Sequence, residues 1–203
     1  MRIPLQVAAL FLGSLCGIVA RPPQNGIRQI DFKNFAYPWT NESDGGGTTY
    51  WHWIRSTPRL TITVVDGRYT FSDLDDADGG PLPTIFFESV TYGDLVGDGS
   101  EVAAVRLNYS TGGTNNWDYL YVYRLEHGTP KLCAWLQSGS RAYGGLVRVS
   151  IEDRLLKLDF QDAARRVGDC CSEGFIRVKY RWHHGDFVET GARERGDLKL
   201  DSR

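Results

Sequence analysis

Apolar and polar positions alternate in twos along most of the chain, and the apolar positions are rich in Val, Ile, Tyr, Phe and Trp. This period is typical of β-strands, whose successive side chains point to opposite faces of a sheet. The clearest hairpin joins residues 60–65 to 68–71 through Asp66-Gly67, which supplies the positive φ angles of a tight turn. Similar turns are expected at 127–128, 153–154 and 184–185. The pattern predicts about ten strands, near residues 29–35, 51–54, 60–65, 68–71, 84–92, 102–109, 118–125 and 131–137, with further hairpins at 146–160 and 175–190.

The predicted strands differ in how many of their faces are apolar. Residues 102–109 and 118–125 carry apolar side chains on both faces, which is typical of strands in the middle of a covered sheet. Along 176–182, apolar residues alternate with Arg and Lys, so one face is buried and the other cationic. We interpret the cationic face as solvated and protected from edge pairing, with an anion-binding strip as the alternative.

Helical signals are almost absent, and no repeat recurs at a fixed period. Only residues 162–167 are expected to form a helical turn. We therefore predict an all-β fold, an antiparallel sandwich or partly closed barrel built of hairpins.

The first twenty residues have the layout of a secretory signal peptide. Arg2 precedes an apolar run at 7–15, and Ala20 stands before a polar stretch. Residues 1–20 are therefore expected to be removed from an exported protein, secreted or periplasmic. The apolar run is too short to span a bilayer and is not repeated, so no membrane span is expected. Residues 21–203 are predicted to form a single β-rich domain with a loosely ordered start (21–28) and C-terminal tail (192–203).

Cys16 leaves a lipid anchor as the alternative at this end of the chain. The residue before it is Leu15, where the processing enzyme of lipoproteins usually meets Gly or Ala. We therefore favour the soluble exported form.

The charge of the chain indicates which partners to exclude. It has 23 basic and 25 acidic side chains, a formal net charge of −2. Such a balance implies no strong attraction to nucleic acid or to an anionic membrane. A glycan or an envelope protein is the expected partner.

Three cysteines remain beyond the signal peptide, Cys133, Cys170 and Cys171. They cannot all pair within one chain, and in an oxidising compartment we slightly favour a bridge from Cys133 to one of the other two. The alternative is that Cys133 is a buried free thiol, while Cys170 and Cys171 are reduced or joined to each other.

The segment 92–101 followed by an apolar strand resembles the single calcium loop of FG-GAP or VCBS-type β repeats. Asp94 and Asp98 match the first and third ligand positions of that family. Val96 stands where the family has Asn or Asp, and Val102 stands where it has a later Asp, with Glu101 one residue early. The resemblance implies a Ca²⁺ site formed by Asp94, Asp98 and Glu101.

Two side-chain ligands of the family's loop are thus missing, and a hard cation prefers six to eight oxygens. We expect no tightly bound cofactor and at most weak calcium binding. In the alternative interpretation, Gly97 and Gly99 form the turn and the carboxylates cap it.

On a larger scale, residues 84–198 resemble a group of exported bacterial β-rich proteins whose function is not established. The most distinctive shared pieces are the Gly-Gly loop at 112–113 and the double cysteine at 170–171. This resemblance implies an exported β fold and carries no activity.

The polar loop that begins at 110 is the leading candidate for ligand binding. It lies between two central strands, and loops held by a rigid sheet commonly carry binding residues. Trp can stack on a sugar face while Asn and Asp bond its hydroxyl groups. The candidate ligand-binding residues are Thr114, Asn115, Asn116, Trp117 and Asp118. Alternatively, Trp117 packs on the sheet and the glycines serve the turn.

Two functions remain open from the sequence. The leading hypothesis is an exported, non-enzymatic binding or structural β domain. The alternative is a metal-dependent or cysteine/carboxylate hydrolase that uses the 94–101 carboxylates or the cysteine and histidine loops. The chain contains neither a Gly-x-Ser-x-Gly nucleophile elbow nor a phosphate-cradling glycine motif, so no catalytic residue is assigned.

Overall fold

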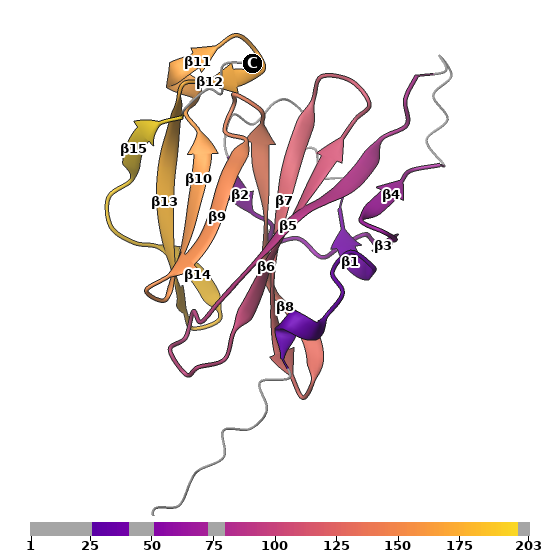
Figure 1. Cartoon of the computed structure of the whole chain (residues 1–203), viewed down its shortest axis with the longest axis vertical. Helices are drawn as coiled ribbons and strands as arrows, with labels where there is room; N and C mark the ends of the chain where they lie inside the picture. The colour runs from indigo at the N-terminus through magenta and orange to yellow at the C-terminus, as the bar shows by residue number, and fades with distance from the viewer. Residues whose placement is uncertain (1–25, 41–50, 73–79, 199–203) are drawn as a thin grey trace, which may run out of the picture.

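A computed structural model of the chain describes residues 26–40, 51–72 and 80–198 (Figure 1). The predicted signal peptide, with Cys16, lies outside the described residues. The strands are β1 (Phe35–Trp39), β2 (His52–Trp53), β3 (Leu60–Val64), β4 (Arg68–Thr70), β5 (Thr84–Gly93), β6 (Val102–Ser110), β7 (Asn116–Glu126), β8 (Thr129–Ser140), β9 (Leu146–Glu152), β10 (Leu155–Gln161), β11 (Arg166–Val167), β12 (Cys171–Ser172), β13 (Gly174–His183), β14 (Asp186–Glu189) and β15 (Glu194–Asp197). Two 3-10 turns, η1 (Ile27–Gln29) and η2 (Ala163–Arg165), complete the described elements.

The strands form an all-β sandwich, as the alternation predicted. The central sheet has six strands in the order β2-β8-β7-β6-β5-β4. A five-stranded sheet, β14-β13-β10-β9 with β15 on β13, covers one of its faces, and the two-stranded β1–β3 sheet covers the other. The named strand pairs are antiparallel, and within the described ranges none of the sheets closes into the barrel that was the alternative.

The central strands β6 and β7 contribute to two separate cores, which confirms that both of their faces are apolar. Because side chains alternate along a strand, neighbours in sequence enter opposite layers. Ala103, Val105 and Leu107 face the β1–β3 layer, whereas Val102 and Ala104 face the five-stranded sheet. On β7 the first core receives three tyrosines, and the second receives Leu120 and Val122.

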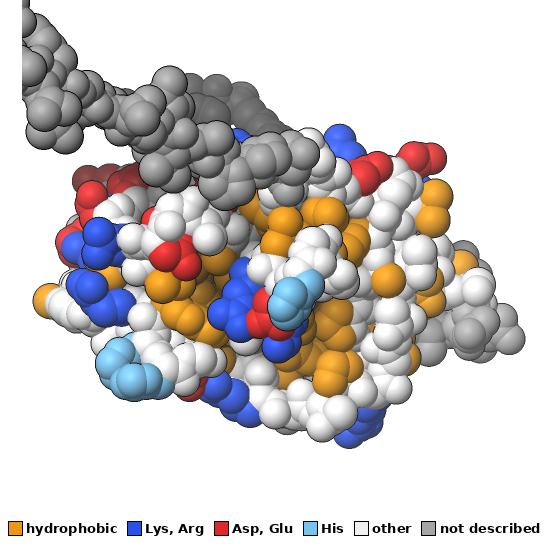
Figure 2. Space-filling view, turned by 90° about the horizontal axis from the view of Figure 1, so that it is seen from below, with side chains coloured by type: hydrophobic (Ala, Val, Ile, Leu, Met, Phe, Trp, Pro, Cys, Tyr) orange, Lys and Arg blue, Asp and Glu red, His pale blue; other side chains and the backbone are white. Residues whose placement is uncertain are grey.

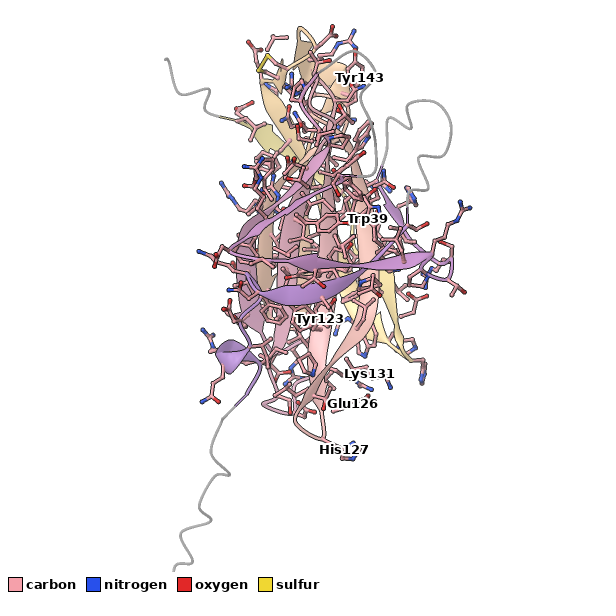
Figure 3. All side chains as sticks on the ribbon, turned by 90° about the vertical axis from the view of Figure 1, so that its right-hand side faces the viewer. Trp39, Tyr123, Glu126, His127, Lys131 and Tyr143 are labelled. Carbon is pink, nitrogen blue, oxygen red and sulfur yellow. A yellow bond between two sulfur atoms is a disulfide. The ribbon has the colours of Figure 1, made fainter. Side chains whose placement is uncertain are left out.

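The first core contains seven aromatic residues among its fifteen buried ones, and Trp39 and Tyr123 are two of them (Figure 3). Tyr119, Tyr121 and Tyr123 point from β7 towards the β1–β3 layer, and the ring of Trp39 lies 4.5 Å from that of Tyr119. The Tyr121 hydroxyl donates to the Pro38 carbonyl at 2.9 Å, so its polar end is satisfied as its ring is buried. Burial also raises the pKa of Tyr121 well above its ordinary value, so this hydroxyl stays a neutral donor.

The tight turns are formed as predicted, by residues with positive φ. Asp66 and Gly67 have φ of 49° and 78°, and His127 and Gly128 have 52° and 80°. The turns at 153–154 and 184–185 share this left-handed geometry.

One predicted strand needs correction, because residues 29–35 contain the end of η1 and a bend, and β1 begins only at Phe35. The helical turn predicted at 162–167 is present as the short 3-10 turn η2, followed by β11. Of the two segments predicted to be loosely ordered, residues 21–25 and 199–203 lie outside the described residues. In the described parts, Ile27 is buried in the first core and β15 pairs with β13.

Within the described residues, the structure contains no helix of the length and apolarity needed to cross a membrane.

The packing of β5 against β9 leads to the first testable prediction. A Cβ added at Gly93 would lie 2.5 Å from Ile151 Cγ2 and 3.2 Å from its carbonyl oxygen. Because a β-branched side chain moves little, Gly93→Ala should force the two sheets apart and lower the free energy of unfolding by about 1–3 kcal/mol. Urea denaturation would measure the change.

Gly113→Ala is the matched control, since its new Cβ would meet nothing closer than Thr111 Oγ1 at 3.7 Å. Equal midpoints for both variants would contradict the close approach of the sheets at Gly93.

Candidate functional site

A polar cleft is lined by residues of β5, β6 and β7 in the central sheet and by residues at the start of β9 and the end of β10 in the five-stranded sheet. The β6–β7 turn lies at the same end of the molecule as β11–β12 (Figure 1). Its volume is about 330 Å³. It is lined by Phe86, Arg106, Asn108, Ser110, Asn116, Asp118, Arg141, Gly145, Leu146 and Gln161.

The cleft follows from a change of polarity along one face of the central sheet. On β6 that face begins with Val102 and Ala104 and continues with Arg106, Asn108 and Ser110. Buried polar groups need hydrogen-bond partners, so the two sheets pack closely only over the apolar half. The polar half is left lining an open space.

An ion pair crosses the floor of the cleft between β6 and β7. Arg106 Nε donates to Asp118 Oδ1 at 2.9 Å, and the Asn108 amide donates to the same oxygen at 3.3 Å. The Asp118 side chain is only 7% exposed, against 22% for Arg106. Ser138 Oγ accepts the Asp118 backbone N–H at 2.9 Å and fixes this position from β8. The carboxylate is therefore held in one orientation.

A second guanidinium group lies at the end of the cleft nearest to the β6–β7 turn. With its oxygen turned towards Arg141, the Asn116 amide accepts from Nε at 3.1 Å and from Nη2 at 3.0 Å. This orientation is the correct one, because the opposite one would place the amide nitrogen against a guanidinium donor. The amide nitrogen then donates to Ser110 Oγ at 3.0 Å.

The turn that carries Arg141 is closely packed. Arg141 has φ of +44°, a left-handed conformation that an Arg rarely adopts. The Gly145 N–H donates to the Arg141 carbonyl at 2.7 Å. A Cβ at Gly139 would lie 1.8 Å from the Tyr143 carbonyl oxygen. Glycine is thus required under this turn, and the Arg141 backbone has little freedom.

One aromatic ring and one amide complete the cleft. Phe86 is 37% exposed, with the Arg68 guanidinium 5.5 Å from its ring centroid. Gln161 Oε1 is buried and accepts no hydrogen bond from the described residues. The cleft therefore offers an apolar edge besides its charges.

The five residues predicted to bind a ligand are divided by the structure. Asn116 and Asp118 line the cleft, whereas Thr114 and Asn115 are exposed in the loop above it. Trp117 points to the opposite face of β7, where it is half-buried and stacks on Tyr109 with the ring centroids 6.0 Å apart. The alternation of β7 thus separates Trp117 from its two neighbours.

The loop that resembles a calcium site uses its carboxylates within the protein. Asp94 accepts hydrogen bonds from the backbone N–H groups of Val96, Gly97 and Gly99 at 2.6–2.9 Å. Asp98 accepts from one N–H group, that of Ser100, and Glu101 forms a bidentate pair with Arg28 at 2.6 and 2.8 Å. Within the described ranges, His, Cys, Asp and Glu form no group of three or more that could hold a metal ion. Weak calcium binding at this loop stays a prediction.

This loop and the cleft lie at opposite ends of β6. The loop leads into the strand at Val102, whereas Ser110 at its other end lines the cleft. Arg106 is four strand steps from Val102, and Asn108, the register partner of Asp118, is six steps from it, which correspond to about 13 and 20 Å. These distances are too long for the carboxylates of Asp94, Asp98 and Glu101 to contact a ligand held by Arg106 or Asp118.

The cysteines pair differently from the arrangement that we favoured. Cys170 and Cys171 form a disulfide with each other, and Cys133 is a free thiol. Cys133 lies on β8 near Lys131, whereas the disulfide lies at the end of the molecule that carries Tyr143 (Figure 3). The bridge from Cys133 is thus not formed, because its strand position is far from the 168–174 loop. Burial raises the pKa of the Cys133 thiol, which disfavours the reactive thiolate.

Eight of the ten residues that line the cleft were not among the predicted ligand-binding residues: Phe86, Arg106, Asn108, Ser110, Arg141, Gly145, Leu146 and Gln161. The sequence pattern could have indicated Arg106, because it is a charged residue on a predicted strand that is apolar on both faces. The sequence around Arg141 and Gln161 contains no such signal. These residues reach the cleft because the tertiary structure brings the ends of β8 and β10 close to the β6–β7 turn.

No protein-family model matches the chain, and no curated protein or solved structure is significantly similar to it.

The position of Trp117 leads to a prediction about stability. Trp117→Ala removes a half-buried ring from the first core, so the free energy of unfolding should fall by about 2 kcal/mol. Thr114→Ala, in the same loop but exposed, should change it by less than about 0.5 kcal/mol. Thermal and urea unfolding would measure both. An unchanged stability for Trp117→Ala would mean that the ring is not part of the core.

The Asp94 loop leads to a prediction about pH. Burial acts to raise the Asp94 pKa, but the hydrogen bonds from Gly97, Gly99 and Val96 together outweigh it and hold the pKa below its ordinary value. A lowered folded-state pKa stabilises the protein above the unfolded-state pKa, and this contribution is lost as the pH falls through the folded-state value. Asp94→Ala should therefore cost about 1–2 kcal/mol at pH 7, and the difference from wild type should shrink below about pH 4.

Asp98→Ala is the control, because it removes one backbone hydrogen bond where Asp94→Ala removes three. Urea denaturation from pH 7 to pH 3 would show both effects. A loss that is the same at every pH would contradict the role of the charged carboxylate.

Proposed function

We propose that this protein is a non-enzymatic, exported carbohydrate-binding β domain and that the polar cleft is its binding site. One observation carries the proposal. Phe86, Asn108 and Asp118 stand side by side on β5, β6 and β7, because they are register partners across the sheet. An aromatic ring, an amide and a carboxylate thus form one row, about 4.8 Å apart from strand to strand.

This row matches the surface of a sugar ring. A pyranose has an apolar C–H face, which packs against aromatic rings, and hydroxyl groups, which both donate and accept hydrogen bonds. Phe86 supplies the apolar contact, and Asn108 can both donate and accept. Asp118 uses Oδ1 for its contacts within the described residues, which leaves Oδ2 to accept from a hydroxyl group.

The size and rigidity of the cleft also favour binding. A volume of about 330 Å³ lies at the lower end of the range of small-molecule sites. The ion pair on its floor and the packed turn at its end hold the polar groups in place before a ligand arrives. Preorganised groups lose less entropy on binding, which favours affinity.

Binding is better supported than hydrolysis. Glycoside hydrolases generally need two carboxyl groups that flank the scissile bond. Asp118 is the one carboxylate among the residues that line this cleft, and its pairing with Arg106 favours a fixed acceptor. The Asp94 loop and Cys133 lie too far away to supply a second catalytic group.

The proposal predicts that Phe86→Ala weakens glycan binding while the domain stays folded. An aromatic contact of this kind contributes about 0.5–1.5 kcal/mol beyond its area, so affinity should fall about tenfold. Because Phe86 is 37% exposed, the melting temperature should change little. Binding would be followed on an array of neutral and acidic oligosaccharides and by calorimetry on the best of them.

Val188→Ala is the matched control, an exposed apolar residue on β14 in the other sheet, and it should bind like wild type. The proposal fails if no oligosaccharide binds, or if Phe86→Ala and Val188→Ala bind equally. Capture of an envelope protein in place of a glycan would also overturn it.

A further inference from the structure

We infer that the ligand of the cleft is an acidic sugar and that Arg141 recognises its carboxylate. This inference rests on the proposed carbohydrate function and narrows its ligand class. It starts from the charges that line the cleft, Arg106, Arg141 and Asp118. Arg106 and Asp118 form an ion pair, with Nε and Oδ1 2.9 Å apart, and their charges cancel. One positive charge, that of Arg141, is left over.

Arg141 has no carboxylate partner within the described part of the chain. Its guanidinium contacts the neutral amide of Asn116 through Nε and Nη2. A guanidinium has five N–H donors, and this contact leaves the Nη1 group without a partner among the described residues. A planar fork that is fixed on one side presents its other side to a carboxylate, a geometry that lysine cannot reproduce.

The backbone of Arg141 supports a role in binding. Its φ of +44° would suit Gly or Asn, and an Arg in this region carries strain. The Gly145 N–H bonds to its carbonyl at 2.7 Å, so the turn is fixed while the charged side chain lies against the cleft. A strained residue whose charge has no carboxylate partner among the described residues points to a contact made with a ligand.

The spacing between Asn116 and Asp118 along β7 indicates where the two ends of such a ligand lie in the cleft. Asn116, which holds Arg141, and Asp118 are two residues apart on the same face of the strand, about 7 Å along it. This separation is comparable with one monosaccharide ring. A carboxylate is attracted to Arg141 and repelled by Asp118, so the acidic group lies at the Arg141 end and the hydroxyl groups lie near Asp118.

The test compares two ligands that differ in one group. Methyl β-glucuronoside and methyl β-glucoside share the ring and the hydroxyl pattern, and only the first carries a carboxylate. Because a charge-assisted bond is about twice as strong as a neutral one, wild type should bind the glucuronoside about tenfold more tightly in calorimetry or by NMR titration. The same pair with the galacto configuration shows whether the preference depends on one hydroxyl group.

Two variants assign the preference to Arg141. Arg141→Gln should reduce the difference between the two ligands to less than about twofold, because it weakens binding of the glucuronoside more than binding of the glucoside. Arg148→Gln is the matched control, since it removes one positive charge from an arginine that is 65% exposed and lies near Asp159. It should keep the full preference, and the melting temperatures show that both variants are folded.

The possible failures are distinguishable. Equal binding of both ligands by wild type overturns the acidic-sugar inference and leaves carbohydrate binding standing. A preference that survives in Arg141→Gln assigns the carboxylate to another residue and overturns the role of Arg141. If neither glycoside nor any oligosaccharide binds, but a peptide with a free C-terminal carboxylate binds and its amidated form does not, the carbohydrate function itself is wrong.

Discussion

The central sheet must bury both of its faces, and the rest of the molecule is arranged around this requirement. Strands β6 and β7 place an aromatic stripe on one side and a short aliphatic stripe on the other. A sheet that is apolar on both faces is stable only when each face is covered, so two further layers are needed. The β1–β3 layer covers the stripe that contains Tyr121, and the five-stranded sheet covers the stripe that contains Leu120.

The cleft exists because the second stripe is shorter than the strands that carry it. Beyond Ala104 the same face continues with Arg106, and before Leu120 it begins with Asn116 and Asp118. Closing the two sheets over these groups would require a partner for each donor and acceptor. The site is thus a consequence of how far the apolar pattern extends, and one change of polarity sets both the edge of the core and the position of the cleft.

The sequence was informative wherever a pattern is local. Alternation predicted the all-β class and most strands, and Asp66-Gly67 predicted a turn, because both depend on neighbouring residues. Short elements such as β11 and β15 were missed, since two to four residues carry too little periodicity to be seen. Two of the ten residues that line the cleft were among the predicted ligand-binding residues. Asn116 and Asp118 lie in the predicted loop and strand, but Arg141 reaches the cleft only because β8 ends beside it, and no local sequence pattern predicts where β8 ends in space.

Trp117 shows that the position of a residue along a strand is a better guide to its role than its residue type. Successive side chains of a strand point to opposite faces. A tryptophan between two residues that face the cleft therefore points to the other layer.

The charged side chains at the two ends of the sandwich are paired differently. At the end with the Asp94 loop, Glu101 is paired with Arg28, and Lys131 Nζ lies 2.7 Å from Glu126 Oε2. The surface at this end shows hydrophobic side chains interspersed with charged ones (Figure 2). At the cleft, by contrast, Gln161 Oε1 is buried without a partner among the described residues, and the charge of Arg141 is met there only by a neutral amide. An unsatisfied buried polar group costs about 1–3 kcal/mol of stability, and natural sequences break such local rules mostly at functional sites. An anionic ligand would supply the partner that the charge of Arg141 lacks among the described residues, and this is the physical basis of the proposed binding site.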